Sequence, residues 1–515
     1  SVIDGTGKPM FAADIVVEDD TITGILPPGT IDQSVGHDCS GLLLCPGFID
    51  VHGHSDLHVL RNPPLSEKIR QGITTEVSGN CGVGVFPSPP DFTTIKELTT
   101  DVLGSYDDTL FDDFPSYLAK LQQKGCGTNM AFLQAHSPLR CHAMEGNVNR
   151  KACKREVQLM VGALEKSLDA GCLGFSSGLY YAPCMFADRY ELNELLSCLS
   201  SYDRLFSVHM RCEGSEILSS ALEVLNLAER NNVRLQISHL KVIGSHYQML
   251  VAPLLKLIEQ AAHKVDVQFD QYPYEYGSTS LFSLLPPSVL RLGRDTLETL
   301  LAKDAERERI QQEMEHPKGW DSLAALCGWE HICILTLSSN ASYEGLTISE
   351  IARIRGQDPY AAFFDLLKEE QGTALMTDVT QSHESIKQIL CHPLMCFGTD
   401  ALYAGQKAHP RSYQAAIHLL DRYWKQEEVV PIELLISKMT AKPASRLRLA
   451  DRGRIALHCK ADLVLLDPKA LKDCSDARHP DLPSSGVEMV MVNGTVAYRP
   501  EQGPKGCFGL PLLYS

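Results

Sequence analysis

Two histidines, His52 and His54, stand one residue apart at the end of an apolar run, in the segment PGFIDVHGHSD. Residues i and i+2 of a β-strand project from the same face, and the apolar stretches 42–44 and 48–51 predict a buried strand here. Two imidazoles on one side of a buried strand suit a divalent metal ion. They could equally be satisfied core or surface histidines, so the pair alone leaves both interpretations open.

Other reactive side chains also follow strand-like apolar runs. Each has an ordinary structural alternative: Cys81 as a small buried apolar residue, His209 and His239 as core histidines, Asp400 as a helix cap and Lys241 as a solvated charge. Core packing gives no reason, however, to place a ligand-type side chain at the end of every strand. If these strands form one barrel, their ends meet on one rim, where barrel enzymes carry their reactive groups. The joint placement therefore favours a site.

The middle of the chain alternates between strand-like and helical patterns, with glycines at several junctions. This alternation predicts an α/β fold, a (β/α)8 TIM-type barrel. The predicted strands lie at about residues 47–54, 73–80, 129–136, 172–179, 205–211, 234–241, 265–274 and 394–401, and the clearest helices at 152–170, 190–201, 215–231 and 250–262.

Both ends of the chain are β-rich, with short alternating runs and turn residues between them. We expect one small β-sandwich domain assembled from residues 1–46 and 450–515, with the metal-dependent barrel over 47–449. About 120 residues separate the seventh and eighth strands, too many for a simple connection. We therefore expect an inserted subdomain at 281–343, which helps to shape specificity, and a further helix at 359–370.

Composition narrows the class of protein. The 515 residues are too many for one ordinary core. The net charge of −17 disfavours nucleic acid or an anionic membrane as a partner, and neither a transmembrane run nor a signal-peptide pattern is present. The 17 cysteines are scattered and form no C-x-x-C pair, so we expect free thiols in a reducing, cytoplasmic setting.

Seven segments resemble the N-acyl-D-amino-acid deacylases (D-aminoacylases) of the amidohydrolase superfamily, in the family's order and over nearly the whole chain. GNCG followed by SHLK is fairly specific to this branch, because most relatives use a carboxylated lysine where this chain offers Cys81. The resemblance implies a metal-dependent barrel with a β-sandwich side domain. The segments are PGFIDVHGHSD, GITTEVSGNCG, HMRCEG, ISHLK, DQYPYEYGS, FGTDA and AHPRSY.

Matched position by position, the resemblance also implies roles for individual residues. It implies Zn²⁺ as cofactor, with one ion held tightly and a second position that is weaker. Gly53 departs from the family, which usually has threonine between the two histidines, and Tyr180 and Tyr181 are further candidates to face the pocket. The implied roles are tight zinc ligands for Cys81, His209 and His239, a second metal position for His52 and His54, catalytic acid/base for Asp400, and binding of the substrate carboxylate for Lys241, Tyr272, Ser278 and Arg411.

These roles predict zinc-dependent hydrolysis of a small molecule, an N-acyl amino acid of D configuration, to a carboxylate and a free amino acid. Zinc with an open position acidifies water and polarises a carbonyl, and a nearby carboxylate can transfer the proton. One alternative is a cyclic amidohydrolase of the hydantoinase or dihydropyrimidinase type, although those enzymes depend on a bridging carboxylated lysine. Another is a non-catalytic scaffold on the same fold, although such a protein should have lost ligands that are all present here.

Overall fold

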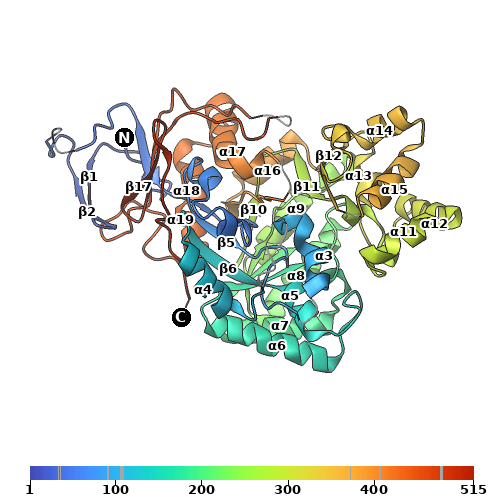
Figure 1. Ribbon diagram of the computed structural model, residues 1–515. Helices are drawn as coiled ribbons and strands as arrows, with labels where there is room; N and C mark the ends of the chain where they lie inside the picture. The colour runs from blue at the N-terminus through green and yellow to red at the C-terminus, as the bar shows by residue number, and fades with distance from the viewer. Residues whose placement is uncertain are drawn as a thin grey trace.

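Eight parallel strands form a barrel at the centre of the computed structural model (Figure 1), which describes residues 1–32, 34, 36–89, 92–104, 110–371, 373–404, 408–475 and 479–514. The first and last strands close the barrel through backbone hydrogen bonds: Asp400 N donates to His52 O (2.8 Å) and His54 N to Ala401 O (3.2 Å). In spatial order the strands are β14 (Met395–Phe397), β10 (Val267–Gln271), β9 (Arg234–Ile237), β8 (Leu205–His209), β7 (Gly174–Gly178), β6 (Asn129–Ala135), β5 (Ile73–Ser78) and β4 (Phe48–Asp50).

The barrel strands are buried on both faces. Apart from Gln268 in β10, every residue of the eight strands is buried, as expected for a parallel sheet that is covered on both faces, so these strands show no alternation of buried and exposed residues. All eight predicted strand positions are confirmed. The observed strands end earlier than predicted, as β9 does at Ile237, because the residues that follow leave the ladder to form the rim.

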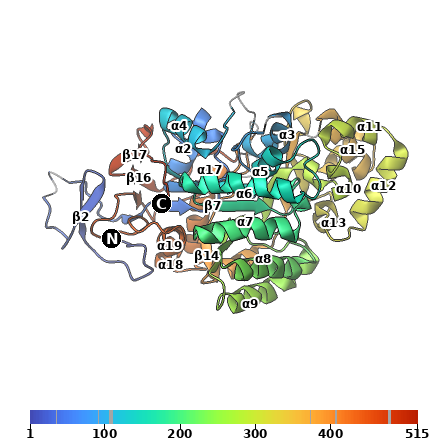
Figure 2. The same cartoon turned by 90° about the horizontal axis from the view of Figure 1, so that it is seen from below.

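Helices surround the barrel in chain order (Figure 2). The four helices predicted most clearly are confirmed within a few residues. In α6 (Lys154–Asp169), for example, Val157, Met160, Leu164 and Leu168 are buried at helical spacing, so one face of this helix packs on the barrel. No helix in the described ranges is long and apolar enough to cross a membrane. These four helices are α6 (Lys154–Asp169), α7 (Arg189–Ser201), α8 (Ile217–Asn231) and α9 (Val251–Ala261).

The two ends of the chain pair with each other beside the barrel (Figure 1). Strand β3 (Leu43–Pro46) is antiparallel to β15 (Leu463–Leu466), in a sheet completed by β16 (Val487–Val492), β17 (Thr495–Arg499) and β18 (Gly503–Pro504). Strands β1 (Asp14–Glu18) and β2 (Thr21–Leu26) form a separate pair. One apolar cluster contains residues from both ends, among them Ile22 and Leu463. We propose that segments 1–46 and 450–515 act as one domain.

A second unit lies at the opposite end of the molecule (Figures 1 and 2). It has its own antiparallel sheet, in the order β11 (Tyr276–Ser280), β13 (Ala374–Val379) and β12 (Ile332–Leu337), and its own hydrophobic cluster. Helix α15 (Pro359–Glu369) matches the helix predicted at 359–370. Because β13 is the central strand, we propose that the inserted unit runs from β11 to β13, wider than the 281–343 expected from the sequence.

Candidate metal centre and active site

Two groups of metal-binding side chains meet at the carboxyl ends of the barrel strands. The first group joins Cys81, His209 and His239; the second joins His52, His54, Cys81 and Asp400. Within each group the potential ligand atoms all lie within 4.8 Å of one another. Cys81 belongs to both groups, so two metal positions here would share its sulfur. All the metal ligands predicted from the sequence therefore converge, and Asp400 joins them.

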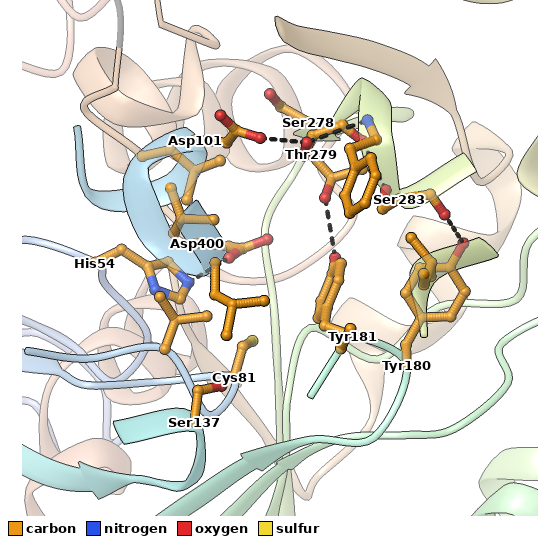
Figure 3. Close-up of a pocket in the computed structure, with 18 of the residues that line it drawn as sticks. His54, Cys81, Asp101, Ser137, Tyr180, Tyr181, Ser278, Thr279, Ser283 and Asp400 are labelled. Carbon is orange, nitrogen blue, oxygen red and sulfur yellow. Dashed lines mark hydrogen bonds and ion pairs between the residues drawn. The ribbon is translucent and has the colours of Figure 1, made fainter. Parts of the chain in front are cut away.

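The contacts within these groups are close. Sγ of Cys81 lies 3.3 Å from Nε2 of His52 and 3.5 Å from Nε2 of His239. His54 and Asp400 point toward each other, with Nε2 3.1 Å from Oδ1, and Cys81 lies below them (Figure 3). A thiol, four imidazoles and a carboxylate form the donor set that zinc prefers.

Three of these residues hold an unusual backbone conformation. Cys81, His239 and Asp400 have φ values of 52°, 34° and 51°, in the left-handed region that residues other than glycine rarely adopt. Such strain persists where the surrounding structure fixes it, often at functional sites. Next to Cys81, a Cβ atom at Gly82 would lie 2.7 Å from the backbone nitrogen of Gly178. The GNCG loop thus brings its cysteine to the rim through a turn that requires glycine.

The protonation states of the first group suit a metal ion. Burial holds the pKa of His209 and of His239 well below the usual histidine range, so both imidazoles are neutral, which is the form that binds metals. Burial raises the pKa of the Cys81 thiol, although His52 opposes this. A bound divalent cation reverses that effect and deprotonates a coordinating thiol. The residues present therefore fit a zinc ion.

Two carboxylates support the histidines. Asp270 accepts a hydrogen bond from the His239 backbone N–H (2.8 Å), and its Oδ1 lies 2.9 Å from Nδ1 of His52. Glu213 lies between the two zinc-ligand candidates, 3.6 Å from His209 and 3.4 Å from His239. Such contacts orient metal-binding imidazoles. Both acids lie inside the motifs HMRCEG and DQYPYEYGS, but their type and spacing alone predicted no role for either.

Asp400 also pairs with Arg411 on the side facing the cavity. Nη1 of Arg411 lies 3.0 Å from Oδ2 of Asp400, and Nη2 donates to the backbone oxygen of Ser278 (3.2 Å). The guanidinium lies over the ring of Tyr272, 4.8 Å from its centroid. Burial alone would raise the pKa of Asp400, but Arg411 and the nearby histidines hold it well below the usual carboxyl range. Asp400 is therefore ionised and able to accept a proton.

Lys241 contacts one candidate metal ligand, His239, and the acid Glu213 that lies beside it. Its Nζ lies 2.7 Å from Glu213 and 2.9 Å from Nδ1 of His239. An imidazole that binds a metal through Nε2 carries its hydrogen on Nδ1 and cannot accept a hydrogen bond there. Metal binding would therefore free the Lys241 ammonium from His239 for another acceptor.

The cavity above the metal group has two lobes, which we call the apolar lobe and the polar lobe. Tyr180, Tyr181, His239, Ser278, Thr279, Asp400 and Arg411 line both. Tyr181 approaches Thr279 at the boundary (Figure 3), so both predicted tyrosines face the cavity. The Ser278 hydroxyl is buried with no hydrogen-bond partner in the described part of the chain. The apolar side chains that the apolar lobe adds include Val83, Leu98, Val102, Phe282, Leu290 and Leu402, beside polar residues such as His54, Cys81, Asp101 and Arg294. The polar side chains that the polar lobe adds include His209, Glu213, Lys241, Tyr272, Asp321 and Asp378, beside Ile243 and Leu323.

The packing around position 53 explains why a glycine lies between the two histidines. A Cβ atom at Gly53 would collide with the carboxylate of Glu76. That carboxylate is held in place by Ser78 Oγ (2.8 Å) and by Lys68 (3.2 Å), which also pairs with Asp50. Glu76 therefore occupies the space that a side chain at position 53 would need.

We expect Gly53→Ala to lower the free energy of unfolding by about 1–3 kcal/mol, the usual cost of overpacking a buried site, measured by urea denaturation. Gly162→Ala is the matched control, because no atom lies within 4 Å of the added Cβ within α6 and alanine favours a helix by about 0.5–1 kcal/mol. Equal stabilities for the two variants would contradict the proposed conflict with Glu76.

The chain is similar to several known proteins. The amidohydrolase family matches residues 286–498. The chain is 31% identical over 500 residues to N-acyl-D-glutamate deacylase of Alcaligenes xylosoxydans xylosoxydans, covering 96% of this chain and 92% of that protein. The chain belongs to the N-acyl-D-amino-acid deacylase family of amidohydrolases. The chain is also 29% identical to D-aminoacylase of the same organism, over 97% of this chain and 93% of that protein.

Solved structures of this deacylase family extend the likeness to the fold. N-acyl-D-glutamate deacylase from Bordetella bronchiseptica, complexed with zinc and a phosphonate inhibitor that mimics the tetrahedral intermediate, has a TM-score of 0.83 at 30% identity, covering 99% of this chain and 98% of that one. A D-aminoacylase structure with a binuclear metal centre has a TM-score of 0.81 at 28% identity, with the same coverage. A D-hydantoinase from Thermus sp. shares only the fold, at 15% identity and a TM-score of 0.58.

Proposed function

We propose that this protein is a zinc-dependent hydrolase that cleaves N-acyl-D-amino acids to a carboxylate and a free D-amino acid. The observation that carries the proposal is the meeting of the Cys81 sulfur with His209 and His239, beside the ionised Asp400. The deacylase relatives support the linear amide and the D configuration. The shared sulfur and the pair His52 and His54 support a second, weaker metal position.

Cys81, His209 and His239 would hold the zinc ion, which when bound would lower the pKa of a water molecule and polarise the amide carbonyl. Asp400 accepts the proton of the attacking water and returns it to the departing amine nitrogen. Arg411 holds Asp400 in place through Oδ2, and His54 contacts Oδ1. Because Asp400 is buried on the rim, the proton passes between groups that are screened from bulk solvent.

We propose that the substrate carboxylate lies between Lys241, Tyr272, Ser278 and Arg411. All four line the polar lobe. Arg411 offers the planar fork that suits a carboxylate and Lys241 offers a compact charge. The Ser278 hydroxyl, which is buried without a partner among described residues, is available to donate. The small-molecule substrate is thereby held on one side of the scissile bond.

The two alternatives are less well supported. A cyclic amidohydrolase would be expected to offer a lysine at the position that Cys81 occupies, and hydantoinases are similar to this chain in fold alone. A non-catalytic scaffold gives no reason to preserve the full set of ligands with Asp400 and Arg411 buried beside them.

We expect zinc-loaded protein to release acetate from N-acetyl-D-amino acids at least about 100-fold faster than from their L enantiomers. If the site fixes both the substrate carboxylate and the scissile carbonyl, the side chain of the L enantiomer points in the wrong direction. The measurement is kcat/KM over paired D and L substrates, with hydantoin and dihydrouracil in the same panel. Chelation should abolish the activity and added Zn²⁺ restore it. Turnover of the cyclic amides alone would contradict the proposal.

We further propose that the protein works in the reducing cytoplasm. In support, all 17 cysteines lie in described residues, and they are free thiols. Cys81 must also stay reduced to bind metal, which suits that compartment.

A further inference from the structure

We propose that the polar lobe recognises the amino-acid side chain of the substrate, and that Asp378 selects side chains ending in a positive charge, as in N-acyl-D-lysine or N-acyl-D-arginine. This inference rests on the proposed deacylase function and names its substrate class. Asp378 lies in β13 of the inserted unit, outside the seven segments that resemble the deacylase family.

The orientation of the substrate follows from the lining of the two lobes. The apolar lobe carries aliphatic side chains such as Leu98, Val102 and Leu290. Its two arginines are already paired, Arg294 with Asp101 at 2.5 Å and Arg411, which also lines the polar lobe, with Asp400. Lys241 and Tyr272 line the polar lobe and do not line the apolar lobe. If the carboxylate lies at those residues, the amino-acid half of the substrate occupies the polar lobe and the acyl half occupies the apolar lobe.

Within the polar lobe, the cations already have partners. Lys241 pairs with Glu213 and Arg411 with Asp400. Asp321 accepts hydrogen bonds at Oδ2 from the backbone N–H groups of Glu213 and Gly214. Four of the residues that line the lobe are carboxylates and two are permanent cations, so two carboxylates, Asp321 and Asp378, have no cation paired with them. Asp321 has backbone donors instead.

Asp378 is the remaining carboxylate. It is only 3% exposed, and among the described residues no other residue forms a hydrogen bond or ion pair with its carboxylate. Its own backbone N–H donates to it, and Lys241 and Arg411 lie near enough to lower its pKa, although each is already paired with another acid. A buried carboxylate without a partner is costly, and a cation bound beside it removes that cost. Burial raises the pKa of Asp378 to about 6, so the group is charged in an assay at pH 8.

Asp378 is also close to the proposed carboxylate site. The two strands pair Gly277 with Asp378, and a Cβ atom at Gly277 would lie 3.2 Å from Oδ1 of Asp378 and 3.1 Å from the Tyr272 hydroxyl. The tyrosine hydroxyl and the acid therefore both lie close to the α-carbon of Gly277, which places Asp378 beside the proposed carboxylate site. Ile243 and Leu323 line the same lobe and suit the methylene stem of a long basic side chain. An acidic side chain would be repelled.

The test compares kcat/KM at pH 8 for the N-acetyl derivatives of D-lysine, D-leucine and D-glutamate, in zinc-loaded wild-type protein and in Asp378→Asn. We expect the wild type to prefer D-lysine over D-leucine by about tenfold or more, since charge-assisted hydrogen bonds are worth at least that factor, and to use D-glutamate least. Asp378→Asn should reduce the D-lysine preference about tenfold and raise the relative rate for D-glutamate.

Asp365→Asn is the matched control, because Asp365 lies in the inserted unit on α15 and pairs with Arg307, away from the lobe; its substrate ranking should equal that of the wild type. A wild-type preference for D-leucine or D-glutamate, or a ranking unchanged in Asp378→Asn, would overturn the inference and leave the deacylase function standing. Failure to hydrolyse any of the three would instead count against the deacylase function itself.

Discussion

We expect Asp400→Asn to lower kcat by about 10²- to 10⁴-fold, the usual contribution of a positioned general acid/base. Asparagine keeps the size of the side chain and can still contact His54 and Arg411, but it cannot take a proton from water. Since Cys81, His209 and His239 form a group without Asp400, the variant should keep its tight zinc. The measurement is turnover of the best N-acetyl-D-amino acid, with zinc content determined on the same sample.

The control for this prediction is again Asp365→Asn, which removes a carboxylate that is remote from the rim and should leave both zinc content and kcat unchanged. Zinc loss together with activity loss in Asp400→Asn would mean that Asp400 acts mainly as a ligand. Full activity with zinc retained would contradict its role as acid/base.

We expect Cys81→Ala to lose both tight zinc and activity, with kcat/KM reduced by more than about 10³-fold because water activation depends on the metal. Cys81 is the one side chain shared by both metal-binding groups, and its removal leaves two neutral imidazoles, which bind zinc much more weakly than a set that includes a thiolate. The measurement is zinc content after dialysis against a weak chelator, followed by kcat/KM with and without added Zn²⁺.

Cys198→Ala is the matched control, because Cys198 is a buried cysteine on α7 that belongs to neither metal-binding group. It should keep zinc and activity while losing some packing energy. Tight zinc and normal turnover in Cys81→Ala would rule out the thiolate as a ligand.

The barrel could be predicted from the sequence because short strand-like segments rich in apolar residues recur along the chain, and amphipathic helices such as α6 lie between them. The candidate ligands could be predicted because they follow those strands directly. The helix at 359–370 was equally visible from its own pattern.

Features that depend on contacts between distant segments could not be predicted in this way. Strand β11 pairs with β13 almost 100 residues later, as in Ser278 with Thr377, so the limits of the inserted unit are not visible locally. Asp378 gains its significance only from that pairing. Likewise, the absence of a side chain at Gly53 is explained by Glu76 on the neighbouring strand.

The most direct test of this account is X-ray absorption at the zinc edge, on wild-type protein loaded with one equivalent of Zn²⁺. If Cys81, His209 and His239 hold that ion, the spectrum will require one sulfur at about 2.3 Å together with nitrogen or oxygen ligands at about 2.0–2.1 Å, and Cys198→Ala will give the same result. A wild-type spectrum that is fitted by nitrogen and oxygen ligands alone would contradict the proposed metal centre.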